Sequence, residues 1–144
     1  SKFFLERKFK TWITPHSKEF SRLFPNIKGE TNVELAFNAA KEFNISVLLK
    51  GANSIVADDK KAWQLCGTDS QTARAGLGDL LSGFLAGSSS IDLTFTRNIT
   101  TEFFAKYTLL HSYASSKCKT GSNAHDIGYE LSKLMRNKKM RQIS

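Results

Sequence analysis

The sequence predicts an α/β protein in which helices cover a sheet, and three segments carry this prediction. Residues 45–49 form an almost unbroken apolar run, which is typical of a strand buried on both faces of a sheet. Residues 33–43 repeat apolar side chains at the spacing of one helical face. Residues 54–57 and 62–66 are short strand-like stretches separated by Asp-Asp-Lys-Lys, so we expect them to pair as a hairpin.

The amino-terminal part of the chain is expected to add one strand and two helices. Residues 11–14 are β-branched or aromatic and stop at Pro15, as a short strand would. Thr14 is then expected to cap a helix with Pro15 at its first position, where a missing N–H costs nothing. The second helix is expected to begin at Thr31, which forms the pattern of a capping box with Glu34.

Three helices are expected in the rest of the chain. The first follows a glycine-rich turn, is apolar from residue 80 to 86, and is expected to end at the three serines after Gly87. Gly83 and Gly87 lie four residues apart, so we expect them to allow close packing against another element. The second helix covers the amphipathic stretch 99–114, and Asn123 is expected to cap the third.

Length and composition indicate one domain without a membrane segment. The chain has 144 residues, and its formal charge of +8 comes largely from basic residues near both ends. Solvated chain ends explain this charge better than a nucleic-acid site. The two cysteines match no metal or redox spacing, and no apolar run reaches the ~18 residues of a membrane span. We therefore expect a cytoplasmic protein with reduced thiols, and neither nucleic acid nor membrane as a partner.

Residues 71–84 contain the strongest chemical signal in the sequence. Glycines precede an apolar helix there, and the first N–H groups of a helix form an anion site. The amides of Gly76, Leu77 and Gly78 are therefore candidates for an anion hole. Asp79 follows at once, and a carboxylate beside an anion can take a proton from an attacking hydroxyl or organise a metal ion. The alternative is that Asp79 only caps the helix. The dinucleotide-binding and P-loop glycine patterns are both absent from the sequence.

Two further polar segments follow expected strands. His16 and Glu19 come after the first strand, and Lys50 comes after the apolar strand with a glycine and a serine close behind it. The carboxyl ends of strands are where open α/β sheets bind ligands. His16 is either a ligand contact or a solvated or capping residue, and Lys50 is either a phosphate or ribose contact or a solvated strand end. His111 lies beside an apolar helix face and is expected to be packed rather than catalytic.

Three segments together carry a resemblance to a known family. They are Thr14-Pro15-His16 with Glu19-Phe20 and Arg22-Leu23, then Leu49-Lys50-Gly51-Ala52-Asn53-Ser54, then Ala73-Arg74-Ala75-Gly76-Leu77-Gly78-Asp79 with Leu81 and Gly83. In this order they resemble the carboxyl-terminal half of the ADP-dependent NAD(P)H-hydrate dehydratases, which belong to the ribokinase-like superfamily. The resemblance runs from Trp12 to about Leu134. It implies the carboxyl-terminal part of a ribokinase-like three-layer α/β/α fold.

The resemblance also implies a function, the repair of hydrated nicotinamide cofactors. Such an enzyme removes water from the 6-hydroxy adduct of NADH or NADPH, with ADP or ATP as phosphoryl donor and Mg²⁺ sharing the phosphate charge. It assigns His16 to the hydrated cofactor, and Asp79 to the substrate hydroxyl as the general base of phosphoryl transfer. No protein residue is assigned as a metal ligand. The nucleotide is assigned to Lys50, Gly51, Ala52, Asn53, Ser54 and Gly78.

Two features depart from the family pattern. Residues 67–71 match the usual approach to the glycine turn poorly, so they receive no role. The amino-terminal half of the family fold is absent, so we expect residues 1–144 to be a single domain that forms the second half of a longer one, with a basic tail at 136–144. An open sheet edge would invite pairing with another copy, which makes a homo-oligomer an expectation. The alternatives are a ribokinase-like small-molecule kinase that retains its phosphorylated product, and a noncatalytic nucleotide-binding fragment.

Overall fold

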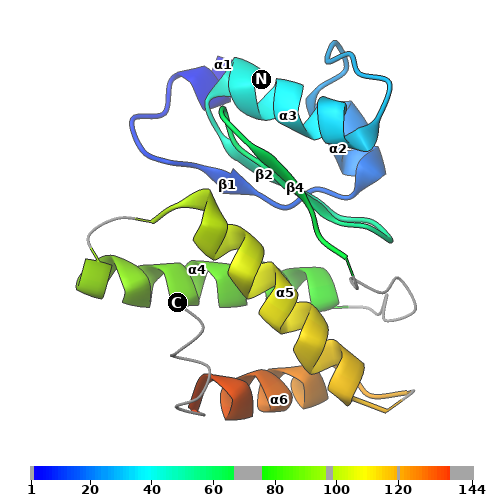
Figure 1. The fold of residues 1–144 in the computed structure, drawn as a ribbon, viewed down its shortest axis with the longest axis vertical. Helices are drawn as coiled ribbons and strands as arrows, with labels where there is room; N and C mark the ends of the chain where they lie inside the picture. The colour runs from blue at the N-terminus through cyan, green and yellow to red at the C-terminus, as the bar shows by residue number, and fades with distance from the viewer. Residues whose placement is uncertain (1, 67–75, 97–98, 120, 137–144) are drawn as a thin grey trace. The chain divides into compact units, whose positions relative to one another are not determined.

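The computed structural model describes residues 2–66, 76–96, 99–119 and 121–136 (Figure 1). These residues belong to two compact units. The first unit consists of Ser1–Thr68 and Thr100–Ala105, and the second of Asp69–Ile99 and Lys106–Ser144. That residues 1–144 form a single domain stays a prediction.

A four-stranded sheet with the order β1-β2-β3-β4 forms the base of the first unit. β1 (Trp12–Ile13) is parallel to β2 (Ser46–Leu49), and all four residues of β2 are buried. β3 (Ile55–Ala57) and β4 (Ala62–Gln64) continue the sheet as an antiparallel hairpin. The buried strand and the hairpin were both predicted from the sequence, and the sheet with its helices confirms the α/β class.

Two helices supply the core on one face of this sheet. α2 (Ser17–Leu23) and α3 (Asn32–Phe43) follow β1 in the chain, and Figure 1 shows α3 lying across the strands. A four-residue helix that was not predicted, α1 (Lys2–Leu5), precedes β1. The apolar stripe of α3 is buried because it meets alternate side chains of the strands. The members of this core are Phe20, Phe24, Ala36, Ala39, Ala40, Phe43, Ile45, Val47, Leu49, Ile55 and Ala57.

Both helices begin with a capping box, but only one box is where the sequence predicted it. Thr31 Oγ1 accepts from the Glu34 amide at 3.1 Å, as expected for α3. For α2, the predicted cap at Thr14 is wrong, because the cap residue is His16. His16 forms a parallel bridge with Lys50 and keeps an extended backbone (φ −82°, ψ 170°), so the helix starts two residues later than predicted.

The first turn of α5 (Thr101–Lys117) also belongs to the first unit. The Trp12 ring stacks on the Phe104 ring, with centroids 4.5 Å apart and planes within 2° of parallel. Phe104 is completely buried. The hydroxyls of Ser46 and Thr101 are 3.1 Å apart in a buried hydrogen bond. Stacking and hydrogen bonding together fasten the start of α5 to the beginning of the two parallel strands.

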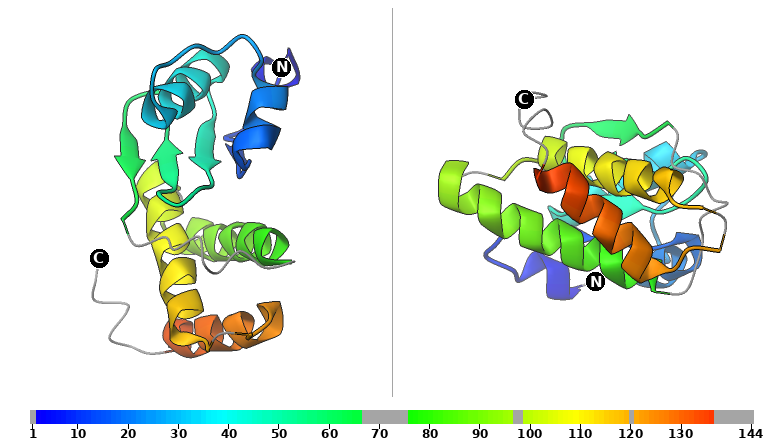
Figure 2. Two further views of the ribbon diagram at one scale, coloured as in Figure 1. Left: turned by 90° about the vertical axis from the view of Figure 1, so that its right-hand side faces the viewer. Right: turned by 90° about the horizontal axis from the view of Figure 1, so that it is seen from below.

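The second unit contains three helices. They are α4 (Leu77–Thr96), the remainder of α5, and α6 (Ala124–Arg136), and Figure 2 shows α6 alongside α4. The Tyr107 ring of α5 meets the Phe84 ring of α4 edge-on at 5.6 Å, and its hydroxyl donates to Asp92 of α4. Burial and this hydrogen bond raise the pKa of Tyr107, so the phenol stays protonated.

α4 is longer than the sequence predicted. The expected end at the serines after Gly87 is wrong, because Ser89 and Ser90 donate to the carbonyls of Leu85 and Ala86 one turn earlier. Serine hydroxyls satisfied in this way let a helix continue. The expected close packing at Gly83 and Gly87 is not found among the described residues, where a Cβ at either position would meet nothing within 4 Å.

α6 has the predicted cap. Asn123 Oδ1 accepts from the amides of His125 and Asp126 at 2.9 and 3.2 Å, and Asp126 Oδ2 accepts from the Asn123 amide at 2.8 Å. The helix ends at Arg136, and the rest of the predicted basic tail lies outside the described residues. Of the helices in the described ranges, none has the length and apolar character needed to cross a membrane.

Candidate functional site

The carboxyl ends of β1 and β2 place two predicted site residues next to each other. Because the two strands are parallel, the residues that follow them emerge at the same edge of the sheet. His16 and Lys50 form an isolated parallel bridge beyond the strand ends. The Lys50 amide donates to the Pro15 carbonyl at 2.9 Å. The sequence placed each residue at a strand end, and the strand pairing explains why they are neighbours.

The His16 side chain is oriented by the capping box of α2. Its Nδ1 accepts a hydrogen bond from the Glu19 amide at 3.2 Å, so Nδ1 carries no proton in this arrangement. The proton of a neutral imidazole then sits on Nε2, which lies 3.3 Å from Glu19 Oε1. About half of the His16 side chain is exposed. The ring therefore has a fixed orientation and an accessible face.

Glu19 joins His16 to Lys50. Its Oε2 accepts from the His16 amide at 2.8 Å and lies 3.9 Å from Lys50 Nζ. The hydrogen bond from the His16 backbone lowers the pKa of the Glu19 carboxyl most, and the charges of Lys50, His16 and Arg22 lower it further. Glu19 is therefore ionised at neutral pH. Sequence reasoning noted its position one turn after His16 but gave it no role, because its contact with Lys50 depends on the strand pairing.

The loop after Lys50 is held by a buried serine. Gly51, Ala52 and Asn53 are exposed, whereas Ser54 is buried. The Ser54 hydroxyl lies within hydrogen-bond distance of both the amide and the carbonyl of Gly51, at 3.4 and 3.3 Å. Ser54 thus shapes the loop from inside, and the exposed residues before it are the ones open to a ligand.

The second unit contains the glycine turn and Asp79. Gly76 has φ of +81°, a left-handed conformation that glycine adopts easily, and its carbonyl accepts the first internal hydrogen bond of α4 from Leu80 at 3.0 Å. The amides of Leu77 and Gly78 therefore belong to the first helical turn, where the helix dipole favours an anion. Asp79 is exposed in the same turn. The predicted residues 71–75 lie outside the described residues.

Comparison with known proteins agrees with the resemblance found in the sequence. A family model described as NAD(P)H-hydrate dehydratase matches residues 1–138. The chain belongs to this family. A curated relative, the ADP-dependent (S)-NAD(P)H-hydrate dehydratase of Nitrosopumilus maritimus, is 37% identical over 78 residues, which is 52% of this chain and 27% of the relative.

Solved structures of similar fold match nearly all of this chain. One is a ribokinase-like superfamily protein from Enterococcus faecalis, with a TM-score of 0.69, 21% identity, and coverage of 96% of this chain and 50% of that one. Another is the ADP/ATP-dependent NAD(P)H-hydrate dehydratase of Bacillus subtilis, co-crystallised with ATP and Mg²⁺. It has a TM-score of 0.66 and 20% identity, and the match covers 89% of this chain and 48% of that one. The ribokinase-like fold is confirmed, and the chain spans about half the length of these structures.

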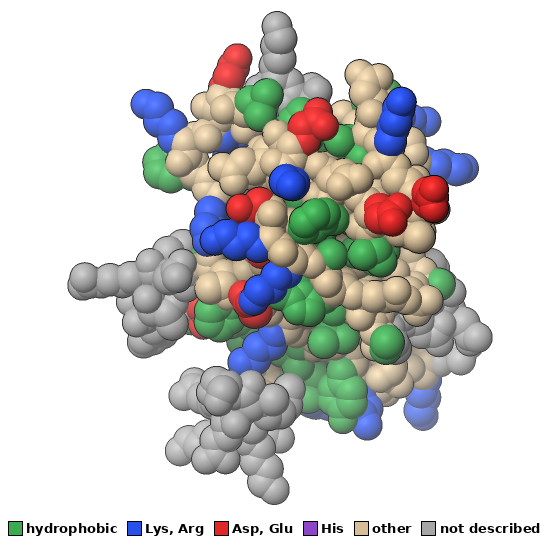
Figure 3. Space-filling model, turned by 45° about the horizontal axis from the view of Figure 1, so that its top comes forward, with side chains coloured by type: hydrophobic (Ala, Val, Ile, Leu, Met, Phe, Trp, Pro, Cys, Tyr) green, Lys and Arg blue, Asp and Glu red, His purple; other side chains and the backbone are tan. Residues whose placement is uncertain are grey.

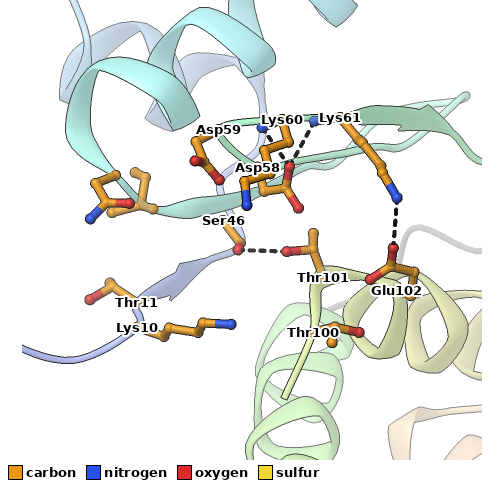
Figure 4. Close-up of a pocket in the computed structure, with 12 residues that line it drawn as sticks. Lys10, Thr11, Ser46, Asp58, Asp59, Lys60, Lys61, Thr100, Thr101 and Glu102 are labelled. Atoms are coloured by element: carbon orange, nitrogen blue, oxygen red, sulfur yellow. Dashed lines mark hydrogen bonds and ion pairs between the residues drawn. The ribbon is translucent and has the colours of Figure 1, made fainter. Parts of the chain in front are cut away.

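A pocket of the first unit lies away from His16 and Lys50. Its volume is about 240 Å³, and Figure 4 shows it at the opposite edge of the sheet, where β1 and β2 begin. Its polar groups largely bond to one another: Asp58 accepts from the amides of Lys60 and Lys61, and Lys61 Nζ lies 3.2 Å from Glu102. Nothing in this arrangement assigns the pocket a ligand.

His111 of α5 is packed, as predicted. It is 8% exposed, and burial lowers its pKa to about 4, so the ring is neutral at physiological pH. Within the described residues, His111 Nε2 has no hydrogen-bond partner. His111 differs in this respect from His16, whose side chain is about half exposed.

Surface charge forms no obvious nucleic-acid patch on the face shown in Figure 3. Lys and Arg side chains are interspersed there with acidic and apolar ones. Several lysines lie over aromatic rings, for example Lys133 over Tyr129 at 4.3 Å. Absence of nucleic acid among the partners stays a prediction, as do the homo-oligomer and the cytoplasmic location.

Proposed function

We propose that this chain takes part in the nucleotide-dependent dehydration of hydrated NADH or NADPH. Membership of the NAD(P)H-hydrate dehydratase family over residues 1–138 carries the proposal. Two features of the described residues support it. His16 and Lys50 are neighbours at the carboxyl edge of the sheet, and Asp79 is an exposed carboxylate in a helical first turn after a left-handed glycine. His16 contacts the hydrated cofactor, and Lys50 with the loop Gly51–Ser54 and Gly78 contacts the nucleotide.

The proposed chemistry has two steps. Asp79 takes the proton of the hydroxyl on ring carbon 6 while that oxygen attacks the terminal phosphorus of ADP or ATP, so one P–O bond forms and the bond to the leaving nucleotide breaks. The C–O bond then breaks and phosphate leaves. Loss of a proton from the neighbouring ring carbon restores the dihydropyridine. The amides of Gly76, Leu77 and Gly78 stabilise the phosphoryl oxygens during transfer.

Magnesium is the metal that this chemistry implies. Within the described ranges, no cluster of three or more His, Cys, Asp or Glu residues could hold a metal ion. Mg²⁺ in phosphate-transfer sites is commonly held by substrate phosphates, waters and one or two carboxylates. The single exposed carboxylate of Asp79 fits such a shared site, and the ion would neutralise phosphate charge when bound.

Replacing Asp79 with asparagine tests the proposal. Asp79→Asn should lower turnover by roughly 10²–10⁴-fold, the range for loss of a general base, and leave nucleotide affinity intact. Turnover is measured as recovery of reduced-nicotinamide absorbance from hydrated NADH in the presence of ADP or ATP.

Asp126→Asn is the matched control, because Asp126 occupies the same third position of a helix in the same unit. It removes a similar charge and weakens the cap of α6, and it should leave turnover unchanged. Equal losses in the two variants would mean that the helix starts, and not Asp79, govern the rate. An Asp79→Asn variant as active as the parent would remove Asp79 from the reaction.

A further inference from the structure

We infer that Glu19 is a positioning residue that holds the His16 imidazole in place for the hydrated cofactor and the Lys50 ammonium in place for the nucleotide. The inference rests on the proposed function, since it deepens the role given to His16. It is carried by one carboxylate that contacts both residues with different oxygen atoms. Glu19 Oε1 faces His16 Nε2 at 3.3 Å, and Oε2 lies 3.9 Å from Lys50 Nζ.

The Glu19 backbone amide fixes the tautomer of the neutral His16 ring. The Glu19 amide donates to Nδ1, which places the proton of the neutral ring on Nε2. Nε2 itself lies 3.3 Å from Oε1 of the Glu19 carboxylate. The main chain of Glu19 thus contacts one ring nitrogen, and its side chain lies near the other. A substrate contact made through the exposed edge of the ring meets a single tautomer in a single orientation.

The Lys50 ammonium lies 3.9 Å from Glu19 Oε2, and its charge adds to the His16 backbone hydrogen bond in lowering the pKa of the Glu19 carboxyl. The Lys50 side chain is 28% exposed, whereas the Glu19 side chain is 48% exposed. The backbone bridge between His16 and Lys50 fixes the bases of both side chains. Because the backbones are already paired, little additional ordering is needed for one carboxylate to span both heads.

The other capping box of the first unit shows that capping alone does not require this geometry. Glu34 occupies the same helix position as Glu19 and accepts from the amides of Thr31 and Glu30. No ion pair involving Glu34 occurs within the part of the chain that the structure describes. Two boxes that share the reciprocal hydrogen bonds of the cap therefore differ in their link to a histidine ring and a lysine.

The first test uses the full chain without ligand. Glu19→Gln keeps the cap, because glutamine serves in capping boxes, but it removes the charge. Nuclear magnetic resonance of ¹⁵N-labelled protein should show the His16 Nε2 and Lys50 Nζ signals shifted in Glu19→Gln. Glu34→Gln should leave both signals in place, with thermal stability equal in the two variants. Unchanged His16 and Lys50 signals in Glu19→Gln would overturn the inference, whatever the activity of the chain.

The second test measures the hydrated cofactor. Glu19→Gln should raise KM for hydrated NADH about two- to fivefold, the range for an exposed ion pair, without changing kcat. Glu34→Gln should leave KM unchanged. A KM raised equally in both variants, or shifted signals without any change of KM, would contradict a positioning role. Lack of turnover by the parent chain would count against the proposed function, and the resonance test would still show whether Glu19 acts on His16 and Lys50.

Discussion

Gly76→Ala should destabilise the protein although the position has room for a methyl group. A Cβ at Gly76 would have Ala124 Cβ as its nearest neighbour, at an ordinary 3.7 Å. The cost comes instead from φ of +81°, since a left-handed conformation costs a residue with a Cβ about 1–2 kcal/mol. Lower entropy of the unfolded chain returns about 0.4–1 kcal/mol. The net loss should therefore be about 1 kcal/mol, or about 3–4 °C in Tm for a chain of this length.

Gly83→Ala is the matched control for this prediction. Gly83 lies inside α4, and a Cβ there would meet no atom of the described ranges within 4 Å, so alanine should stabilise the helix by about 0.5–1 kcal/mol. Urea unfolding of both variants should thus give changes of opposite sign. If Gly76→Ala were as stable as the parent, or if both variants changed in the same direction, the left-handed turn before α4 would be wrong.

Two further perturbations test the separate roles of the histidines. His16→Ala should raise KM for hydrated NADH about two- to tenfold, as for loss of one hydrogen bond, with a smaller effect on nucleotide affinity; Thr31→Ala removes the equivalent cap of α3 and should leave KM unchanged. His111 is buried with its pKa lowered to about 4, so the unfolded chain binds a proton first as the pH falls, and stability should drop between pH 6.5 and about 4. His111→Gln should lose less stability than the parent over that interval in urea unfolding, and an identical pH dependence would place His111 in contact with water.

Sequence periodicity was sufficient for the elements whose signals are local. The run at 45–49 became a fully buried strand, and Thr31 with Glu34 became a capping box, because both depend on a few neighbouring residues. The end of α4 could not be predicted in this way. Three serines look like a break, but the hydroxyls of Ser89 and Ser90 donate to carbonyls of their own helix. Only the three-dimensional helix shows that these polar groups are satisfied.

In the candidate site, too, residues with a local sequence signal could be predicted, whereas contacts that depend on the fold could not. Motif residues such as His16, Lys50 and Asp79 could be selected from the sequence because their residue types and their order match a family. The contact of Glu19 with Lys50 could not, since it depends on β1 and β2 being parallel neighbours in register. The cap at His16 also depends on this strand pairing. His16 forms a bridge with Lys50, so α2 starts later in the chain than the sequence predicted.

The most direct test of the proposed function is the stoichiometry of the reaction. The chain is incubated with hydrated NADH, ADP or ATP, and Mg²⁺, while recovered NADH and released inorganic phosphate are measured together. The proposal predicts one phosphate released for each NADH recovered, and loss of both products in Asp79→Asn. Phosphate that remains attached to the nicotinamide compound would indicate a kinase, and release of phosphate without recovery of NADH would contradict dehydration.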